Sequence, residues 1–124
     1  MEKENRTQLD ELRFYQDAMH LWDNCWNDVD VLIKDVWGRE VAKQLTRSVG
    51  SISANIEEGY GRGFGKEYPH FLRIARGSAQ ESKGWYRRSK FILPKDVIEK
   101  RIAAIDGIIA RITKTISTLE RKKR

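Results

Sequence analysis

Residues 47–78 read RSVGSISANIEEGYGRGFGKEYPHFLRIARGS and place four glycines between two segments that have the hydrophobic period of a helix. Apolar residues before the glycines recur at steps of three and four, which keeps them on one helix face. The members of that face are Ala42, Leu45, Val49, Ile52 and Ile56. Each glycine inside a helix costs roughly 1 kcal/mol relative to alanine. The stretch therefore predicts two helices joined by a turn at Gly59, Gly61, Gly63 and Gly65.

The rest of the chain shows two more segments of the same period and no alternating strand pattern. An apolar seam runs from Tyr15 to Val36, with Met19, Trp26 and Ile33 beside it, and an isoleucine-rich seam follows Pro94. The prediction is an all-α, antiparallel up-and-down four-helix bundle that forms a single domain over residues 1–124. The expected helices cover residues 7–37, 39–62, 66–92 and 95–121.

Length and composition limit the class of protein. The chain has 124 residues, a charged first segment (MEKENRTQLDE) and no apolar run near the roughly 20 residues of a membrane span. We therefore expect a cytoplasmic protein. The single cysteine, Cys25, has helical spacing with Trp22 and Val29, which favours a buried hydrophobic role over a reactive thiol.

Charge is distributed unevenly along the chain. Residues 1–40 hold five Lys/Arg and ten Asp/Glu, a net charge of −5, whereas residues 41–124 have a net charge of +11. The third predicted helix carries a basic stripe at steps of three and four, extended by nearby cations. The candidate nucleic-acid-binding residues are Arg62, Lys66, Arg73, Arg76, Lys83, Arg87, Arg88 and Lys90. Such a stripe can track phosphates, and the alternative is a solvated helix face that aids solubility.

Catalytic and metal-binding patterns are weak. The two histidines, His20 and His70, lack further ligands at suitable spacing, so we expect no metal. The sequence GYGRGFGK is followed by Glu67 where a phosphate loop requires Ser or Thr, and no strand precedes it, so an interhelical turn is favoured. No nucleophile, base and orienting group form a set, and we expect no enzyme activity and no cofactor.

A polar face follows the apolar face of the second predicted helix, and one carboxylate of the third helix is placed to reach it. Its residues, with the adjoining glycine, are Arg47, Ser51, Asn55, Glu58, Gly59 and Glu81. This face is expected to fix helix register or a subunit contact; contact with nucleic acid is the alternative.

The same residues carry a resemblance that covers nearly the whole chain. The segment from Gln44 to Arg62 contains the pattern S-I-x-x-N-I-x-E-G, and Phe71, Gly77 and Glu81 follow at matching positions. This pattern closely resembles that of the 23S rRNA-intervening-sequence proteins. The resemblance implies bacterial four-helix bundles that assemble into homopentameric rings, without established catalysis. A related, strongly basic accessory protein of diversity-generating retroelements binds nucleic acid and a reverse transcriptase.

Two functional hypotheses follow. The first is a non-enzymatic, homo-oligomeric bundle that binds RNA or DNA through the basic stripe. The second is an interaction scaffold or accessory subunit that docks an acidic protein partner.

Overall fold

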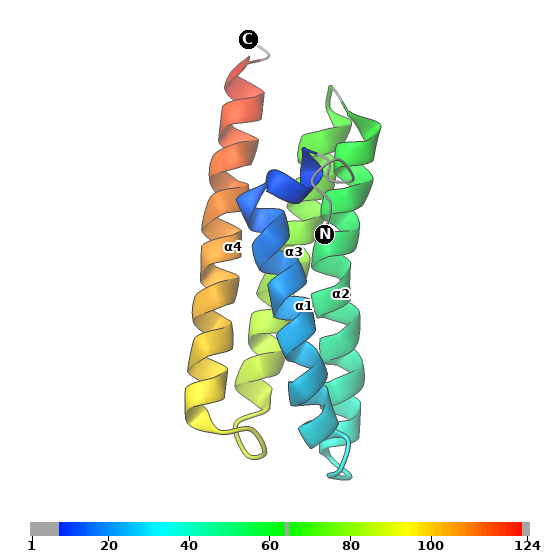
Figure 1. Cartoon of the computed structure of the whole chain (residues 1–124), viewed down its shortest axis with the longest axis vertical. Helices are drawn as coiled ribbons and strands as arrows, with labels where there is room; N and C mark the ends of the chain where they lie inside the picture. Colours follow the sequence, from blue (N-terminus) through cyan, green and yellow to red (C-terminus); the bar gives the residue numbers. More distant parts are fainter. Residues whose placement is uncertain (1–7, 64, 123–124) are drawn as a thin grey trace.

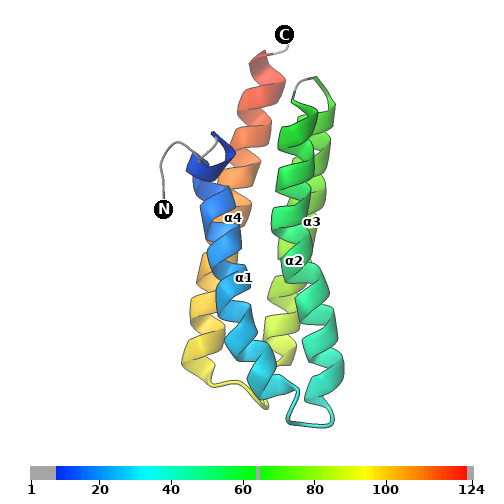
Figure 2. The ribbon, with the colours of Figure 1, turned by 45° about the vertical axis from the view of Figure 1, so that its right-hand side comes forward.

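A computed structural model of the protein describes residues 8–63 and 65–122, and four long helices account for most of them (Figure 1). The elements are the short 3₁₀ helix η2 (Leu9–Glu11), α1 (Arg13–Leu32), α2 (Gly38–Arg62), α3 (Glu67–Arg88) and α4 (Lys95–Lys122). Each helix packs against the next in the chain, and α4 returns to α1. Figure 2 shows the resulting antiparallel up-and-down bundle from a second direction. The predicted fold class is confirmed.

The first helix is shorter than the predicted 7–37 at both ends. Leu12 has an extended backbone (φ −72°, ψ 124°) that separates η2 from α1. After Leu32 the chain turns, because Asp35 Oδ1 accepts hydrogen bonds from the backbone N–H groups of Trp37 (2.8 Å) and Gly38 (3.1 Å). The predicted seam residue Val36 therefore lies in a turn, with 75% of its surface exposed.

The third helix also ends earlier than the predicted residue 92. The backbone N–H of Ser89 donates to the carbonyl of Tyr86, and residues 89–94 form a turn before α4 begins at Lys95. The second and fourth helices lie within one residue of their predicted bounds.

The core is a continuous apolar column between the four helices. All five predicted core residues of α2 are buried, and so are Leu72, Ala75 and Ala79 of α3. The seam of α1 is rotated from the predicted one. Phe14, Ala18, Leu21, Cys25 and Leu32 are buried, whereas Tyr15, Trp22 and Val29 lie at the margin. No helix among the residues described here is long and apolar enough to cross a membrane.

The glycine cluster is only partly the predicted turn. Gly63 and Gly65 have positive φ (81° and 76°) and form the α2–α3 turn, while Gly59 and Gly61 lie in the last turn of α2. Gly59 is buried against α3. A Cβ atom there would lie 2.7 Å from Phe71 Cβ, closer than two carbon atoms can approach. Gly59 is therefore explained by packing rather than by a turn.

Candidate nucleic-acid interface

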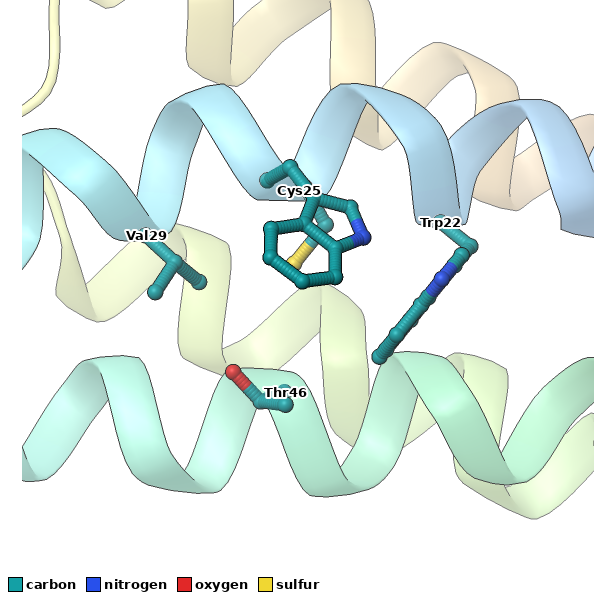
Figure 3. A pocket seen from close by; sticks show the side chains of 5 residues that line it. Trp22, Cys25, Val29 and Thr46 are labelled. Atoms are coloured by element: carbon teal, nitrogen blue, oxygen red, sulfur yellow. The ribbon is translucent and has the colours of Figure 1, made fainter.

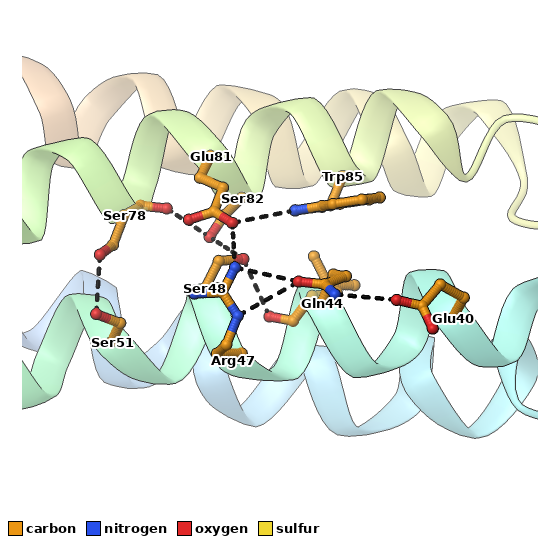
Figure 4. A network of polar contacts seen from close by, with 10 residues as sticks. Glu40, Gln44, Arg47, Ser48, Ser51, Ser78, Glu81, Ser82 and Trp85 are labelled. Carbon is orange, nitrogen blue, oxygen red and sulfur yellow. Dashed lines mark hydrogen bonds and ion pairs between the residues drawn. The ribbon is translucent and has the colours of Figure 1, made fainter.

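The polar face of α2 meets α3 through a set of serine hydroxyls (Figure 4). Ser78 Oγ of α3 donates to Ser51 Oγ of α2 over 2.8 Å, and Ser82 Oγ lies 3.0 Å from Ser48 Oγ. Asn55 Nδ2 donates to Ser51 Oγ over 2.9 Å. These small side chains hold the two helices close together and fix their register.

An ion pair also joins α2 and α3 along this face. The Arg47 guanidinium contacts Glu81, and Gln44 Oε1 accepts a second hydrogen bond from Arg47 over 3.1 Å. Trp85 Nε1 lies 3.4 Å from the same Glu81 oxygen. The structure thus brings Arg47, Ser51, Asn55 and Glu81 together along the α2–α3 seam, as their spacing suggested.

Glu58 belongs to a separate cluster at the α2–α3 turn. Arg62 Nε donates to Glu58 over 2.9 Å, and Arg62 Nη1 donates to Glu67 over 3.1 Å. The hydrogen bond with Glu58 raises the pKa of the Arg62 guanidinium. Two carboxylates therefore already neutralise Arg62, while Lys66 next to it is exposed.

The middle of the basic stripe is also engaged, because it lies beside α4. Arg73 pairs with Glu120, and Lys83 Nζ lies 2.7 Å from Asp106 Oδ1. Arg76 Nη1 donates to Thr113 Oγ1 over 3.1 Å. The stripe predicted from α3 alone is thus not one continuous positive surface, because carboxylates of α4 interrupt it.

Cations without carboxylate partners gather at the C-terminal end of α3. Arg87, Lys90 and Lys95 line one open pocket with Ile98 and Glu99. Within residues 8–63 and 65–122, no ion pair involves any of these three cations. Arg88 lies above the Trp85 ring, 4.8 Å from its centre, and likewise has no carboxylate partner in the described part of the chain. Because α3 has 22 residues, this group lies roughly 30 Å from Arg62 and Lys66.

An apolar groove lies on the other side of the bundle, between α1 and α2. Figure 3 shows Trp22, Cys25 and Val29 of α1 above Thr46 of α2. Trp26 completes the groove, whose volume is about 170 Å³. That volume is below the range of small-molecule sites, roughly 300–1,000 Å³, and is closer to the size of one large side chain. Burial raises the pKa of the Cys25 thiol to about 11, so the thiol has the character expected of a buried hydrophobic residue.

A buried polar network in the core was not predicted. Asp28 is only 4% exposed, and its Oδ2 accepts hydrogen bonds from Tyr86 Oη (2.5 Å) and Arg101 Nε (2.7 Å). Burial, followed by the nearby Cys25 and Asp28, raises the pKa of the Tyr86 hydroxyl. The hydrogen bond to Asp28 raises the pKa of Arg101. The sequence did contain one signal for this network. Asp28 has the helical spacing of the buried residues Leu21, Cys25 and Leu32.

The polar network has a structural role in the core. Tyr86, Asp28 and Arg101 satisfy one another, and no buried side-chain nitrogen or oxygen in the described residues lacks a hydrogen-bond partner. Those residues also contain no cluster of three His, Cys, Asp or Glu side chains arranged to hold a metal ion.

Comparisons with known proteins agree with this architecture. The chain is similar to a crystal structure of a protein of unknown function from the S23 ribosomal protein family of Bacteroides thetaiotaomicron. The two share 21% sequence identity and a TM-score of 0.76, over 83% of this chain and 97% of the other. That likeness shows the fold. A search among curated proteins found no match. The sequence model that describes the 23S rRNA-intervening sequence protein matches residues 10–117. The chain therefore belongs to the 23S rRNA-intervening sequence protein family.

Proposed function

We propose that this protein is a non-enzymatic, homo-oligomeric bundle that binds RNA or another nucleic acid in the cytoplasm. The observation that carries the proposal is the group of unpaired cations at the end of α3: Arg87, Lys90 and Lys95 around one pocket, with Arg88 nearby. When a protein cation binds a phosphate, the nucleic acid releases the counterion that was condensed on it. A cation that a carboxylate already neutralises gives little net release, whereas an unpaired cation gives the full effect. Binding is therefore assigned to this end, with Arg73, Arg76 and Lys83 in a secondary role.

A direct test is fluorescence anisotropy with labelled fragments of ribosomal RNA at several salt concentrations. Wild-type protein should bind, with an affinity that falls steeply as salt rises. Changing Arg87, Lys90 and Lys95 together to alanine should weaken binding strongly and flatten the salt dependence.

The control variant removes the same number of positive charges away from this pocket, at Lys43, Lys114 and Lys122, which are exposed on α2 and α4. It should bind nearly as well as wild type. Equal losses in both variants would mean that net charge alone drives binding, and the assignment to the end of α3 would be wrong.

The homo-oligomer is the second part of the proposal, and the apolar groove on α1 supports it. Trp26, which lines the groove, is 66% exposed, and Ile33, seven residues further along the chain, is 45% exposed. Large exposed apolar residues that gather in one region are typical of protein contacts. Because residues 1–40 are acidic and the remainder is basic, a head-to-tail contact between unlike surfaces is favoured. Such a contact forms a ring when its rotation closes, and the family resemblance suggests a ring of five copies.

Light scattering coupled to size exclusion tests the assembly. Wild type should have several times the 14.5 kDa mass of one chain, and Trp26→Asp should reduce this to a single chain. Phe91→Asp, on the α3–α4 turn, is the matched control because Phe91 is also an exposed aromatic residue, and it should leave the mass unchanged. A monomeric wild type at micromolar concentration would refute the oligomer.

The runner-up function is a scaffold that docks an acidic protein on the same cations. It predicts that a protein, with no nucleic acid, co-purifies with the chain in stoichiometric amount from its native host. Loss of that protein on changing Arg87, Lys90 and Lys95, without any nucleic-acid binding by the wild type, would favour the scaffold.

A further inference from the structure

Two turns lie side by side at one end of the bundle: residues 33–37 between α1 and α2, and residues 89–94 between α3 and α4 (Figures 1 and 2). They meet where α2 begins. A Cβ atom on Gly38, the first residue of α2, would lie only 2.9 Å from Ile92 Cδ1, so the backbone directly after the first turn is packed against a side chain of the second. The two turns therefore form one continuous surface.

Each turn presents an aromatic side chain to solvent. Trp37 is 85% exposed and Phe91 is 88% exposed, the two largest exposures among the large apolar side chains that the structure describes. Most other aromatic residues differ from them: Phe14 and Tyr86 are buried, and Trp22, Tyr68 and Trp85 pack against the core. Trp26 is 66% exposed, but its ring is paired edge to face with that of Trp22. Neither Trp37 nor Phe91 is paired with another aromatic ring within the described residues. Both rings therefore remain open to stacking, although Lys90 lies over one face of the Phe91 ring.

The same surface is positively charged where Phe91 stands. Residues 87–95 contain four Lys/Arg and no Asp/Glu. Lys90 Nζ lies 5.2 Å from the centre of the Phe91 ring, and Arg87 and Lys95 line the adjoining pocket. Glu99 is the carboxylate in that pocket, so the cations there are in excess. Two copies of the positively charged 87–95 segment would repel one another, which disfavours contact between these two segments.

From this arrangement we infer that the turn end of the bundle binds single-stranded nucleic acid, with Phe91 and Trp37 stacking on bases while Arg87, Lys90 and Lys95 contact the phosphates. Free ring faces beside unpaired cations are the two components of a single-strand site. A duplex keeps its bases stacked on each other, so it offers phosphates to the cations but no base face to the rings. The inference rests on the proposed nucleic-acid function and specifies its ligand as an unpaired strand.

The test compares a labelled 12-nucleotide RNA with a blunt duplex of the same sequence, at fixed salt, by fluorescence anisotropy. Phe91→Ala and Trp37→Ala should each weaken single-strand binding by roughly 5- to 100-fold, the range measured for one stacked base. Duplex binding should change less than 2-fold, and the salt dependence of single-strand binding should stay the same. Phe91→Trp should retain wild-type affinity, because a ring is preserved.

Ile74→Ala is the matched control, since Ile74 is an exposed apolar residue in the middle of α3. It should bind as wild type does, and circular dichroism should show that all variants remain helical. The triple alanine variant of Arg87, Lys90 and Lys95 should weaken both single-strand and duplex binding strongly. This contrast separates the role of the rings from that of the charges.

Three results would overturn the inference. Wild type that binds single strand and duplex equally, with no effect of the aromatic changes, would leave nucleic-acid binding standing and remove the stacking role. Loss of the oligomer in Phe91→Ala or Trp37→Ala would make these rings subunit contacts. Wild type that binds neither RNA would refute the proposed function and this inference together.

Discussion

Replacing Gly59 with alanine should destabilise the protein, whereas the same change at Gly61, two residues along α2, should not. A methyl group at residue 59 would lie 2.7 Å from Phe71 Cβ and 3.3 Å from the backbone oxygen of Tyr68. Carbon atoms in good contact are about 3.5–4.0 Å apart, so α2 and α3 would have to separate locally by close to 1 Å. At Gly61 a methyl group would meet nothing within 4 Å.

The magnitude follows from the difference between the two sites. Both changes gain the same helix propensity, up to about 1 kcal/mol, because both residues are helical with ordinary φ values. Only Gly59→Ala adds the cost of overpacking, typically 1–3 kcal/mol. We expect Gly61→Ala to be neutral or stabilising, and Gly59→Ala to be less stable than Gly61→Ala by about 2 kcal/mol.

Urea unfolding followed by circular dichroism at 222 nm measures both variants at one protein concentration. Equal m-values would show that only stability has changed. If Gly59→Ala were as stable as Gly61→Ala, the close approach of α2 and α3 at this residue would be wrong, and the glycine would instead belong to the turn.

Three further predictions concern buried and interhelical groups. Tyr86→Phe should lower the free energy of unfolding by about 1.5–3 kcal/mol, because Asp28 loses a hydrogen bond inside the core; an unchanged urea midpoint would contradict this. Between pH 8 and pH 10 the wild type should lose about 1 kcal/mol more stability than Cys25→Ala, as measured by urea unfolding at each pH. The sign follows because the folded thiol, with a pKa near 11, keeps a proton that the unfolded chain, with a pKa of 9.0, releases as pH rises. A double-mutant cycle on Arg47 and Glu81 should give a coupling of at most about 1 kcal/mol, since both side chains are over one third exposed; a larger value would indicate that another subunit covers the pair.

Helix number and the core face of α2 were predictable because hydrophobic period is a local property of the sequence. The end of α1 was predicted wrongly because the hydrophobic period continues beyond the residue at which the chain turns. Val36 continues the apolar spacing, but Asp35 binds the N–H groups of Trp37 and Gly38 and turns the chain before Val36 can join the helix. The sequence shows that Asp35 can accept hydrogen bonds from nearby backbone N–H groups and so compete with the helix. Whether Asp35 ends the helix depends on where α2 begins.

The site was harder to predict, because its charge balance depends on contacts between distant segments. Arg73 and Glu120 are 47 residues apart, and nothing in the spacing of α3 shows that a carboxylate of α4 will neutralise Arg73. Asp28 was overlooked for the same reason. A carboxylate on an apolar seam suggests a partner inside the core, but Tyr86 and Arg101 lie 58 and 73 residues away.

The pairing of charges also predicts how strongly salt weakens nucleic-acid binding. If all eight cations of the predicted stripe contacted phosphates, the logarithm of affinity for a single strand would fall with the logarithm of salt concentration with a slope of roughly −6. Arg62, Arg73 and Lys83 already have carboxylate partners, so a phosphate that displaces a carboxylate there gives little net release of counterions. The four cations of residues 87–95 alone give a slope of about −3. A measured slope near −3, becoming shallower and close to −1 in the triple alanine variant, would assign binding to the turn end. A slope near −6 would mean that the stripe opens its ion pairs and binds along its whole length.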